Sequence, residues 1–184
     1  MLTIKHISAE QTFLLRHQVL RPKQSPLDCS FDCDNFPHVF HIGAFSASHT
    51  GIEQDNSIMG EPGYLIGVAT FFIELTDHSL DPFVKGNSTM SIKDEFSEQY
   101  GRTDVTNIWR LRGMATAASA RGLGVGSQVL AVGLQHIKSR LGKLLWCNAR
   151  TTATDFYSKQ GFLVGSERFD IDGIGPHCIM YKCI

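Results

Sequence analysis

The sequence has no apolar run long enough to span a membrane, and its amino terminus lacks the long apolar core of a signal peptide. The formal net charge at pH 7 is -1, so no excess of basic residues points to nucleic acid or to an anionic membrane. No internal repeat or low-complexity segment occurs in the 184 residues. These absences favour a cytoplasmic protein with one compact domain, residues 1–184, that binds neither nucleic acid nor membrane.

The chain has five cysteines, an odd number that favours free thiols over a disulfide framework. Cys29 and Cys33 precede His38 and His41, a grouping that a structural zinc ion could use. The spacings are loose and His41 falls in a strand-like run, so we expect no metal. Cys147 could be a nucleophile, but no histidine lies near it in the sequence, and we interpret it as a small buried hydrophobic residue.

The most informative segment is Arg-Gly-Leu-Gly-Val-Gly at 121–126, between a strand-like run and a helix-like run. Glycines at alternate positions let the backbone approach a ligand and adopt conformations that side chains forbid. The amides that open the helix lack internal partners and lie at the positive end of its dipole. Such a loop binds phosphate or pyrophosphate, and the guanidinium of Arg121 can pair with phosphate oxygens.

Two common nucleotide-binding loops do not match this segment. The dinucleotide fingerprint requires a third glycine where Ser127 stands, and a P-loop requires a lysine directly after Gly126. The pattern that fits is R-x-x-G-x-G, formed by Arg121, Gly124 and Gly126 after a strand and before a helix.

A second motif lies at 153–162, where the residues form the pattern A-x-x-F-Y-x-x-x-G-F. Ala153, Phe156 and Tyr157 share one face of a short helix, and Gly161 can end that helix in a left-handed conformation. Taken together and in this order, the two motifs resemble the GNAT acetyltransferase superfamily.

The resemblance implies that the glycine loop holds the pyrophosphate of acetyl-coenzyme A, the acyl donor. It places the coenzyme at the following residues: Met114, Ala115, Thr116, Arg121, Gly122, Gly124, Gly126, Ser127 and Arg150. It also implies that the hydroxyl of Tyr157 points toward the coenzyme sulfur and protonates the leaving thiolate. Arg150 stands where many members carry a coenzyme-contacting asparagine, so it binds phosphate or pantetheine, or it only covers the start of a helix.

The order of elements predicts an α/β fold with a mixed, mostly antiparallel central sheet and flanking helices. Expected strands cover 2–7, 38–45, 64–75, 108–116, 143–149, 162–169 and 178–183, and expected helices cover 8–20, 127–140 and a short segment around Tyr157. The resemblance implies that strands 108–116 and 143–149 splay apart around the coenzyme. A polar insertion at about 76–106, with a short helix near 92–100, predicts a lid, an oligomer contact as in a homodimer, or a disordered segment.

Local patterns predict details of these elements. Ser8 and Gln11 form a capping box at the start of the first helix. The predicted packing residues are Phe13, Leu14, His17, Val19 and Leu20 in the first helix and Val129, Leu130, Leu134, Ile137 and Leu141 in the second, which Gly142 caps. Alternation along 108–116 predicts that Arg110, Arg112, Met114 and Thr116 share one face of their strand.

Acyl transfer from a thioester to an amine requires a neutral amine, a donor to the carbonyl oxygen and protonation of the thiolate. Many GNAT members carry a glutamate on the strand before the glycine loop, whereas residues 107–120 contain no carboxylate. The base could instead be Glu74, His41 or His177 acting through water, or solvent alone. Arg112 would suit a carboxylate or phosphate on the acceptor, or else it pairs with one of the chain's own acids.

The leading hypothesis is an N-acetyltransferase that moves an acetyl group directly to a primary amine of a small molecule or an exposed peptide. The irregular segment 22–37 is either a source of acceptor contacts or a simple surface loop. An alternative is a non-catalytic acyl-coenzyme A sensor of the same fold, which the missing strand carboxylate favours and Tyr157 disfavours. An acyl-transferring signal synthase of related fold fits the intact 153–162 motif less well.

Overall fold

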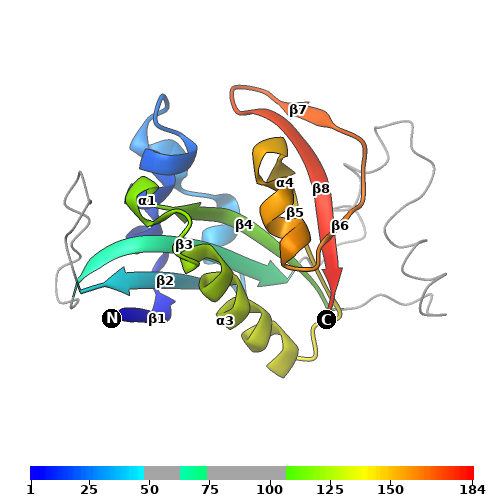
Figure 1. Ribbon diagram of the computed structural model, residues 1–184, viewed down its shortest axis with the longest axis horizontal. Coiled ribbons are helices and arrows are strands. Elements are labelled where there is room, and N and C mark those ends of the chain that lie inside the picture. The colour runs from blue at the N-terminus through cyan, green and yellow to red at the C-terminus, as the bar shows by residue number, and fades with distance from the viewer. Residues whose placement is uncertain (48–62, 74–106) are drawn as a thin grey trace. The chain divides into compact units, whose positions relative to one another are not determined.

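The computed structural model describes residues 1–47, 63–73 and 107–184 of the chain. The expected insertion at 76–106, its short helix and the candidate base Glu74 lie outside these residues. The elements, with 3-10 helices written η, are β1 (Leu2–Ile7), α1 (Ala9–Leu20), η1 (Pro26–Cys29), η2 (Asp32–Asn35), β2 (Phe40–Ser46), β3 (Tyr64–Ile73), β4 (Ile108–Thr116), η4 (Ala118–Ala120), α3 (Val125–Ser139), β5 (Leu144–Arg150), η5 (Thr151–Ala153), α4 (Thr154–Lys159), β6 (Leu163–Val164), β7 (Phe169–Ile171) and β8 (Gly175–Cys183) (Figure 1).

The strands form an eight-stranded sheet in the order β1-β2-β3-β4-β5-β8-β6, and β7 also pairs with β8. The β4–β5 pair is parallel, whereas β1–β2, β2–β3 and all three pairings of β8 are antiparallel. The predicted mixed, mostly antiparallel α/β fold is therefore confirmed. The β4–β5 ladder runs from the pair Ile108–Leu144 to the pair Arg110–Trp146 and ends there.

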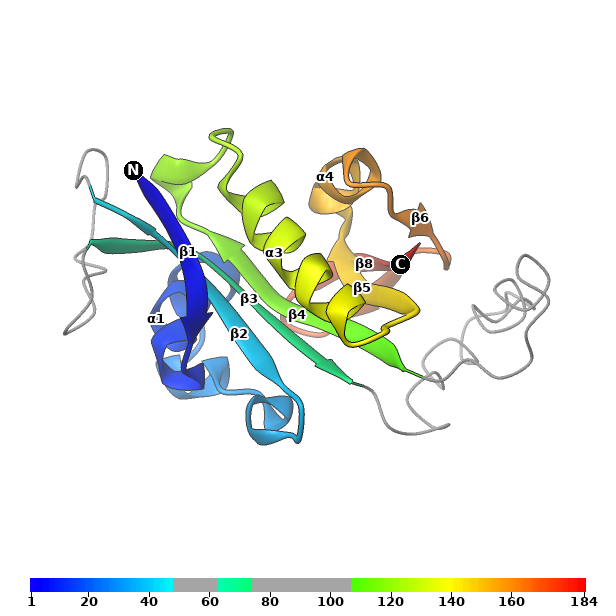
Figure 2. The same ribbon diagram turned by 90° about the horizontal axis from the view of Figure 1, so that it is seen from below.

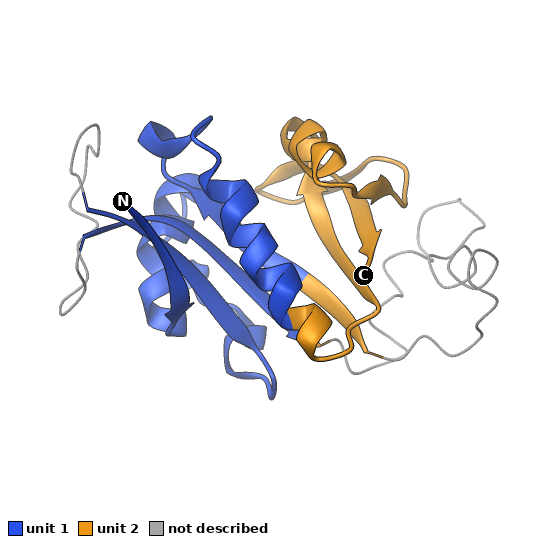
Figure 3. Cartoon of the chain, turned by 60° about the horizontal axis from the view of Figure 1, so that its bottom comes forward, with its two compact units in different colours: residues 1–72, 111–136 blue, residues 73–110, 137–184 orange. Residues whose placement is uncertain are grey.

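The chain divides into two compact units, which Figure 3 distinguishes by colour. The first unit comprises Met1–Phe72 and Leu111–His136, and the second comprises Ile73–Arg110 and Ile137–Ile184. Strand β4 and helix α3 contribute residues to both. The glycine loop at 121–126 belongs to the first unit, and Tyr157 belongs to the second.

In the first unit, α1 and α3 pack on opposite faces of the sheet (Figure 2). Arg16 of α1 donates a hydrogen bond to the hydroxyl of Thr70 on β3. The next residue, Phe71, packs its ring against Gly133 of α3, where a Cβ would collide with it. Because successive strand residues point to opposite faces, these two contacts place the two helices on either side of β3.

Helix α1 begins as the capping box predicts, since the backbone amide of Ser8 donates to Oε1 of Gln11 at 2.8 Å. Its buried residues are Ala9, Thr12, Leu15 and Arg16. Leu14, expected to pack, is 44% exposed, so the predicted packing face is wrong. Apolar periodicity could not identify this face because a buried arginine lies at its centre.

Arg16 is fully buried and forms a bidentate pair with Asp34, with nitrogen–oxygen distances of 2.7 and 2.8 Å. Its Nη1 also donates to the carbonyl oxygen of Cys29 at 2.9 Å. Thr70 accepts a hydrogen bond from Arg16 and lies 2.8 Å from Nδ1 of His41. These contacts tie α1 to η1, η2, β2 and β3.

Gly113 interrupts the alternation of β4. It has a φ of 61°, and a Cβ at this position would lie 2.7 Å from Nε of Arg16 and 2.7 Å from Cε2 of Phe31. The guanidinium of the preceding residue, Arg112, lies 4.3 Å from the centre of the same Phe31 ring. Two neighbouring residues therefore face one ring, and the strict alternation predicted for 108–116 is wrong at this point.

Helix α3 begins at Val125, two residues before the predicted start at Ser127. Its buried residues include Val129, Leu130 and Ile137, as predicted. Leu141, which was expected to be buried, is 72% exposed and takes the left-handed conformation with a φ of 59°. The left-handed residue of the cap is therefore Leu141 and not the predicted Gly142. The amide of Gly142 donates to the carbonyl oxygen of Ile137 at 3.0 Å, and a Cβ at Gly142 would collide with the Ile137 side chain.

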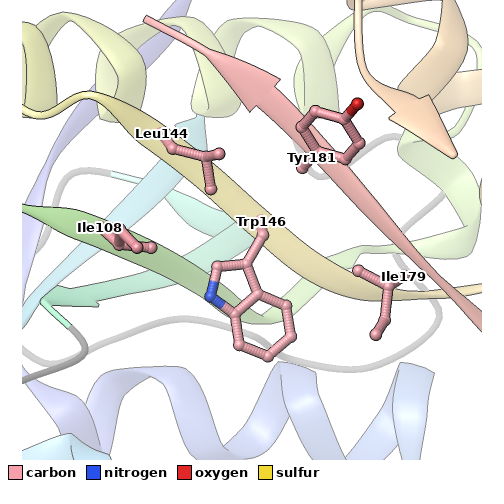
Figure 4. Packing of buried hydrophobic residues seen from close by; sticks show 5 residues of the cluster. All are labelled: Ile108, Leu144, Trp146, Ile179 and Tyr181. Atoms are coloured by element: carbon pink, nitrogen blue, oxygen red, sulfur yellow. The ribbon is translucent and has the colours of Figure 1, made fainter. Parts of the chain in front are cut away.

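The core of the second unit is packed around Trp146 of β5 (Figure 4). Trp146 is buried in a cluster with Ile108, Leu144, Ile179 and Tyr181. The guanidinium of Arg110 lies 4.2 Å from the centre of the Trp146 ring, a cation–π contact. Arg110 therefore takes part in the packing of this core.

Replacing Asp34 with asparagine leaves the buried Arg16 guanidinium without a counter-charge. We expect the free energy of unfolding at pH 7 to fall by about 3–5 kcal/mol, measured by urea unfolding followed by circular dichroism. Burial alone would raise the pKa of Asp34, but the hydrogen bonds from Arg16 and the Phe31 amide, with the charges of Arg16 and His41, hold it below its usual value. A lowered native pKa stabilises the fold above the unfolded pKa, and this stabilisation is lost as pH falls through the native pKa.

The wild type should therefore lose stability more steeply than Asp34→Asn as the pH falls below about 4. Asp32→Asn removes an exposed carboxylate from the same 3-10 helix and serves as the control, with an expected change within about 0.5 kcal/mol. Identical acid profiles for the wild type and Asp34→Asn would contradict this account.

Candidate functional site

The glycine loop connects β4 and η4 to α3 and is exposed from Arg121 to Gly124. Gly122 and Gly124 have φ values of 78° and 77°, in the left-handed region that favours glycine. A Cβ at Gly122 would meet nothing within 4 Å, and one at Gly124 would meet only Nε2 of Gln128 at 4.0 Å. The backbone of this loop is therefore open to a ligand, as binding of a phosphate group requires.

The first turn of α3 presents its amides next to this loop. Gly126 and Ser127 lie in that turn, and the amide of Gln128 donates to the carbonyl oxygen of Gly124 at 3.1 Å. The backbone amides of the residues that precede Gln128 in this turn have no carbonyl acceptor one turn earlier in the same helix. The first turn contains no acidic residue, so its positive dipole end favours an anion.

The other predicted coenzyme residues of the first unit form the end of β4. Ala115 is buried, and Met114 and Thr116 are half-buried. The amide of Ala117 donates to the carbonyl oxygen of Ile66 at 2.9 Å, which fixes the end of β4 to β3. The structure thus brings these residues and the glycine loop together on one continuous stretch of chain.

Tyr157 lies in α4 of the second unit and is 8% exposed. Its ring packs against Phe156 and Phe162, with centroid distances of 5.1 and 5.3 Å. Its hydroxyl is hydrogen-bonded to the thiol of Cys147. Burial, followed by the neighbouring thiol, raises the pKa of Tyr157 well above its usual value. The hydroxyl therefore remains protonated at neutral pH and can give up a proton rather than accept one.

Cys147 lies on β5 and is buried. Burial raises the pKa of its thiol to about 12, against the opposing effect of the hydrogen bond with Tyr157. Such a thiol holds almost no thiolate at neutral pH and is a poor nucleophile. The interpretation of Cys147 as a small buried residue agrees with this chemistry.

Two candidate bases, His41 and His177, are described and both are buried. His41 Nδ1 lies 2.8 Å from the hydroxyl of Thr70, and His177 Nδ1 lies 2.7 Å from the carbonyl oxygen of Gly175. Burial lowers the pKa of both imidazoles, so both are neutral at pH 7. A neutral imidazole can accept a proton, and the role of each as a base stays a prediction.

Arg150 is the last residue of β5 and pairs with His177 in the ladder to β8. It directly precedes η5 and is half-buried. Gly161 ends the α4 segment with a φ of 81°, which confirms the left-handed conformation predicted from the motif. The coenzyme contact expected for Arg150 stays a prediction.

The sequence motifs do not point to the surroundings of Phe31. Three guanidinium groups lie against this ring, those of Arg16, Arg21 and Arg112. They come from α1, the residue that follows it, and β4, so no spacing in the sequence connects them.

Asn148 was also missed. Its Oδ1 is buried and has no hydrogen-bond partner among residues 1–47, 63–73 and 107–184. The sequence signal that could have identified it is a polar residue directly after the apolar run Leu144–Cys147.

The five cysteines are all free. Within the described ranges, no group of three or more His, Cys, Asp or Glu residues is placed to hold a metal ion. None of the described helices is long and apolar enough to cross a membrane.

A model of the acetyltransferase (GNAT) domain matches residues 61–182. The chain is also 31% identical to YitI of Bacillus subtilis (strain 168), an uncharacterized N-acetyltransferase, over 100% of this chain and 97% of that protein. The chain belongs to the GNAT acetyltransferase family.

Two solved structures show the same fold as this GNAT member. ElaA of Escherichia coli has a TM-score of 0.63 at 16% identity, covering 99% of each chain. FeeM, an N-acyl amino acid synthase from uncultured soil microbes, has a TM-score of 0.63 at 10% identity, covering 100% of this chain and 91% of that one. At these identities the likeness concerns the fold alone.

We expect one cysteine of the native protein, Cys183, to react readily with iodoacetamide at pH 8. The other four are buried, and burial raises the pKa of each of them: Cys29, Cys33, Cys147 and Cys178. Mass spectrometry should show one adduct before unfolding and five after unfolding in guanidinium chloride. Rapid modification of Cys147 in the native protein would contradict its burial beside Tyr157.

Proposed function

We propose that this GNAT member transfers an acetyl group from acetyl-coenzyme A directly to the primary amine of a small molecule or an exposed peptide. The observation that carries the proposal is the exposed loop in which Gly122 and Gly124 adopt left-handed conformations before α3. When bound, the coenzyme supplies the acetyl group as a thioester. A homodimer and a cytoplasmic location stay predictions.

In this proposal, the first unit binds acetyl-coenzyme A, the acyl donor. The amides of the first turn of α3 and the exposed guanidinium of Arg121 bind the pyrophosphate. The backbone of Met114–Thr116 binds the pantetheine arm, and one of its amides donates to the thioester carbonyl oxygen. In the second unit, Arg150 binds phosphate or pantetheine.

Tyr157 protonates the thiolate that leaves. Its raised pKa keeps the hydroxyl protonated, and the aromatic packing around it restricts the direction of its ring. A non-catalytic sensor needs to bind acyl-coenzyme A but has no use for a proton donor held in this way. The state of Tyr157 therefore supports an enzyme over a sensor.

Gly124→Val tests the role of the glycine loop. The valine side chain occupies the open space above the loop, so we expect the affinity for acetyl-coenzyme A to fall by at least about 100-fold in calorimetric titration. NAD and ATP serve as ligand controls and should not bind the wild type.

A left-handed valine also strains the backbone by about 1–2 kcal/mol, and this cost requires its own control. Gly173→Val imposes the same strain at a φ of 69° in an exposed turn of the second unit. It should lower stability by a similar amount and leave affinity unchanged. Unchanged affinity in Gly124→Val would remove the loop from coenzyme binding.

Tyr157→Phe tests the proton donor. We expect kcat to fall by about 10²–10⁴-fold while the dissociation constant of acetyl-coenzyme A changes by less than about twofold. Tyr181→Phe removes another buried tyrosine hydroxyl of the second unit and should leave kcat near the wild-type value.

The raised pKa of Tyr157 also predicts the pH profile of the wild type. A general acid is active only while it is protonated, that is, below its pKa. As the pH rises from neutral to about 10, the phenol of Tyr157 stays protonated, so its ionisation should cause no loss of kcat. A wild-type kcat in Tyr157→Phe would exclude this residue as the acid.

A further inference from the structure

Phe31, in the first unit, is surrounded by cations. The ring is 7% exposed and lies between η1 and η2. The guanidinium carbon of Arg16 lies 4.2 Å from the ring centre, that of Arg112 at 4.3 Å and that of Arg21 at 5.2 Å. Cation–π contacts of this kind stabilise each guanidinium modestly and leave its charge unchanged.

These charges are only partly neutralised. Arg16 pairs with Asp34, at 2.7 and 2.8 Å. Arg21 donates to the backbone carbonyl oxygen of Asp28 at 2.6 Å, a neutral acceptor. Arg112 contacts the Phe31 ring and hydrogen-bonds to the thiol of Cys33. Neither Arg21 nor Arg112 has a carboxylate partner within residues 1–47, 63–73 and 107–184, so the alternative in which Arg112 pairs with an acid of the chain finds no support there.

A buried donor in the same cluster also lacks an acceptor. Nε of Arg16 is buried and has no hydrogen-bond partner among the described residues. Arg16 is fully buried, and the only carboxylate that contacts it in the described ranges is that of Asp34. The cluster therefore retains a positive potential that an anion would reduce, and Arg112 and Arg21 are both partly exposed to receive one.

The cluster lies close to the backbone that we assign to the thioester. Arg112 precedes Met114 by two residues on β4, and both belong to the first unit. The left-handed Gly113 is the single residue between them. An anion bound by Arg112 would therefore lie near the stretch of backbone beside which we expect the amine to react.

We propose that Arg112 and Arg21 bind a carboxylate of the acceptor, which makes the acceptor an amine that carries a carboxylate a few bonds from its nitrogen, as an amino acid does. A guanidinium binds a carboxylate through two parallel hydrogen bonds and fixes its orientation. The Phe31 ring holds both guanidiniums in place. This inference rests on the proposed function, and it adds the class of acceptor.

The first test compares three acceptor amines with the wild-type protein. L-alanine carries a carboxylate, ethylamine is the same skeleton without it, and 2-aminoethyl phosphate carries a phosphate. We expect kcat/KM for L-alanine to exceed that for each of the others by at least about tenfold, chiefly through a lower KM. Preference for the phosphate would overturn the assignment of a carboxylate.

A second readout needs no turnover. N-acetylalanine and N-ethylacetamide are the products that acetylation of L-alanine and of ethylamine would give. In calorimetric titrations of the protein, we expect N-acetylalanine to bind at least about tenfold more tightly, and Arg112→Gln to abolish this difference. Equal affinity of the wild type for both compounds would count against the proposal.

Variants then assign the preference to Arg112. Arg112→Gln should raise KM for L-alanine by at least about tenfold with little change for ethylamine, and Arg112→Lys should restore part of the loss. Lys5→Gln removes another cation stacked on an aromatic ring of the first unit, 5.1 Å from the Phe45 ring centre, and should change neither value. Thermal unfolding confirms that each variant is folded, and the comparisons with wild-type protein do not depend on any variant.

Failure of the proposed function and failure of the acceptor assignment give different results. If acetyl-coenzyme A does not bind and no amine is acetylated, the proposed function is wrong and this inference fails with it. If acetyl-coenzyme A binds and ethylamine is acetylated as efficiently as L-alanine, the function stands and the inference is overturned.

Discussion

The first unit depends on one buried charge, the guanidinium of Arg16. Taking a charged group out of water costs several kcal/mol, and a counter-charge together with hydrogen-bond acceptors offsets that cost. Asp34 supplies the counter-charge, Cys29 and Thr70 supply acceptors, and Phe31 supplies a ring face. These partners come from η1, η2, β3 and the short link between the two 3-10 helices, so the same interaction fixes the segment that follows α1. The position of Phe31, and hence of the cations around it, follows from this pairing.

Small residues set how closely the helices of the first unit approach the sheet. Gly113 leaves the space that Arg16 and Phe31 occupy next to β4. On the other face, a Cβ at Gly67 would lie 2.8 Å from a methyl carbon of Val125, the first residue of α3. The start of α3 is thus held directly against β3. Since the glycine loop leads into this point, its position depends on close helix–sheet packing as much as on its own glycines.

The sequence predicted those features that short-range chemistry determines. The strand at 108–116, the left-handed Gly161 and the glycine loop before a helix all follow from a few neighbouring residues. Prediction from the sequence failed where contacts between residues far apart in the chain determine the structure. The packing face of α1 is centred on Arg16, which is acceptable inside only because Asp34 lies opposite it.

The same limit applies to the end of α3 and to the candidate site. Leu141 adopts the left-handed conformation that we assigned to Gly142, because Gly142 is needed where Ile137 comes too close for a Cβ. A glycine in a sequence predicts a special conformation or a close contact, and only the fold shows which. The cations around Phe31 likewise become neighbours through folding, so the motifs pointed to the glycine loop and not to this cluster of guanidiniums.

The lack of a carboxylate on β4 bears on how the acceptor amine becomes neutral. A cation held near an amine disfavours protonation of its nitrogen, and this repulsion is stronger inside a protein than in water. On the assignment of Arg112 to the acceptor carboxylate, the positive charge of the guanidinium offsets the carboxylate's stabilising effect on the ammonium. The fraction of neutral amine then rises without a strong base, and a neutral histidine or water can take the proton. On the assignment of Tyr157 as the acid, this residue has the opposite requirement, because it would keep its proton until the thiolate leaves; burial, which raises its pKa, meets that requirement in the second unit.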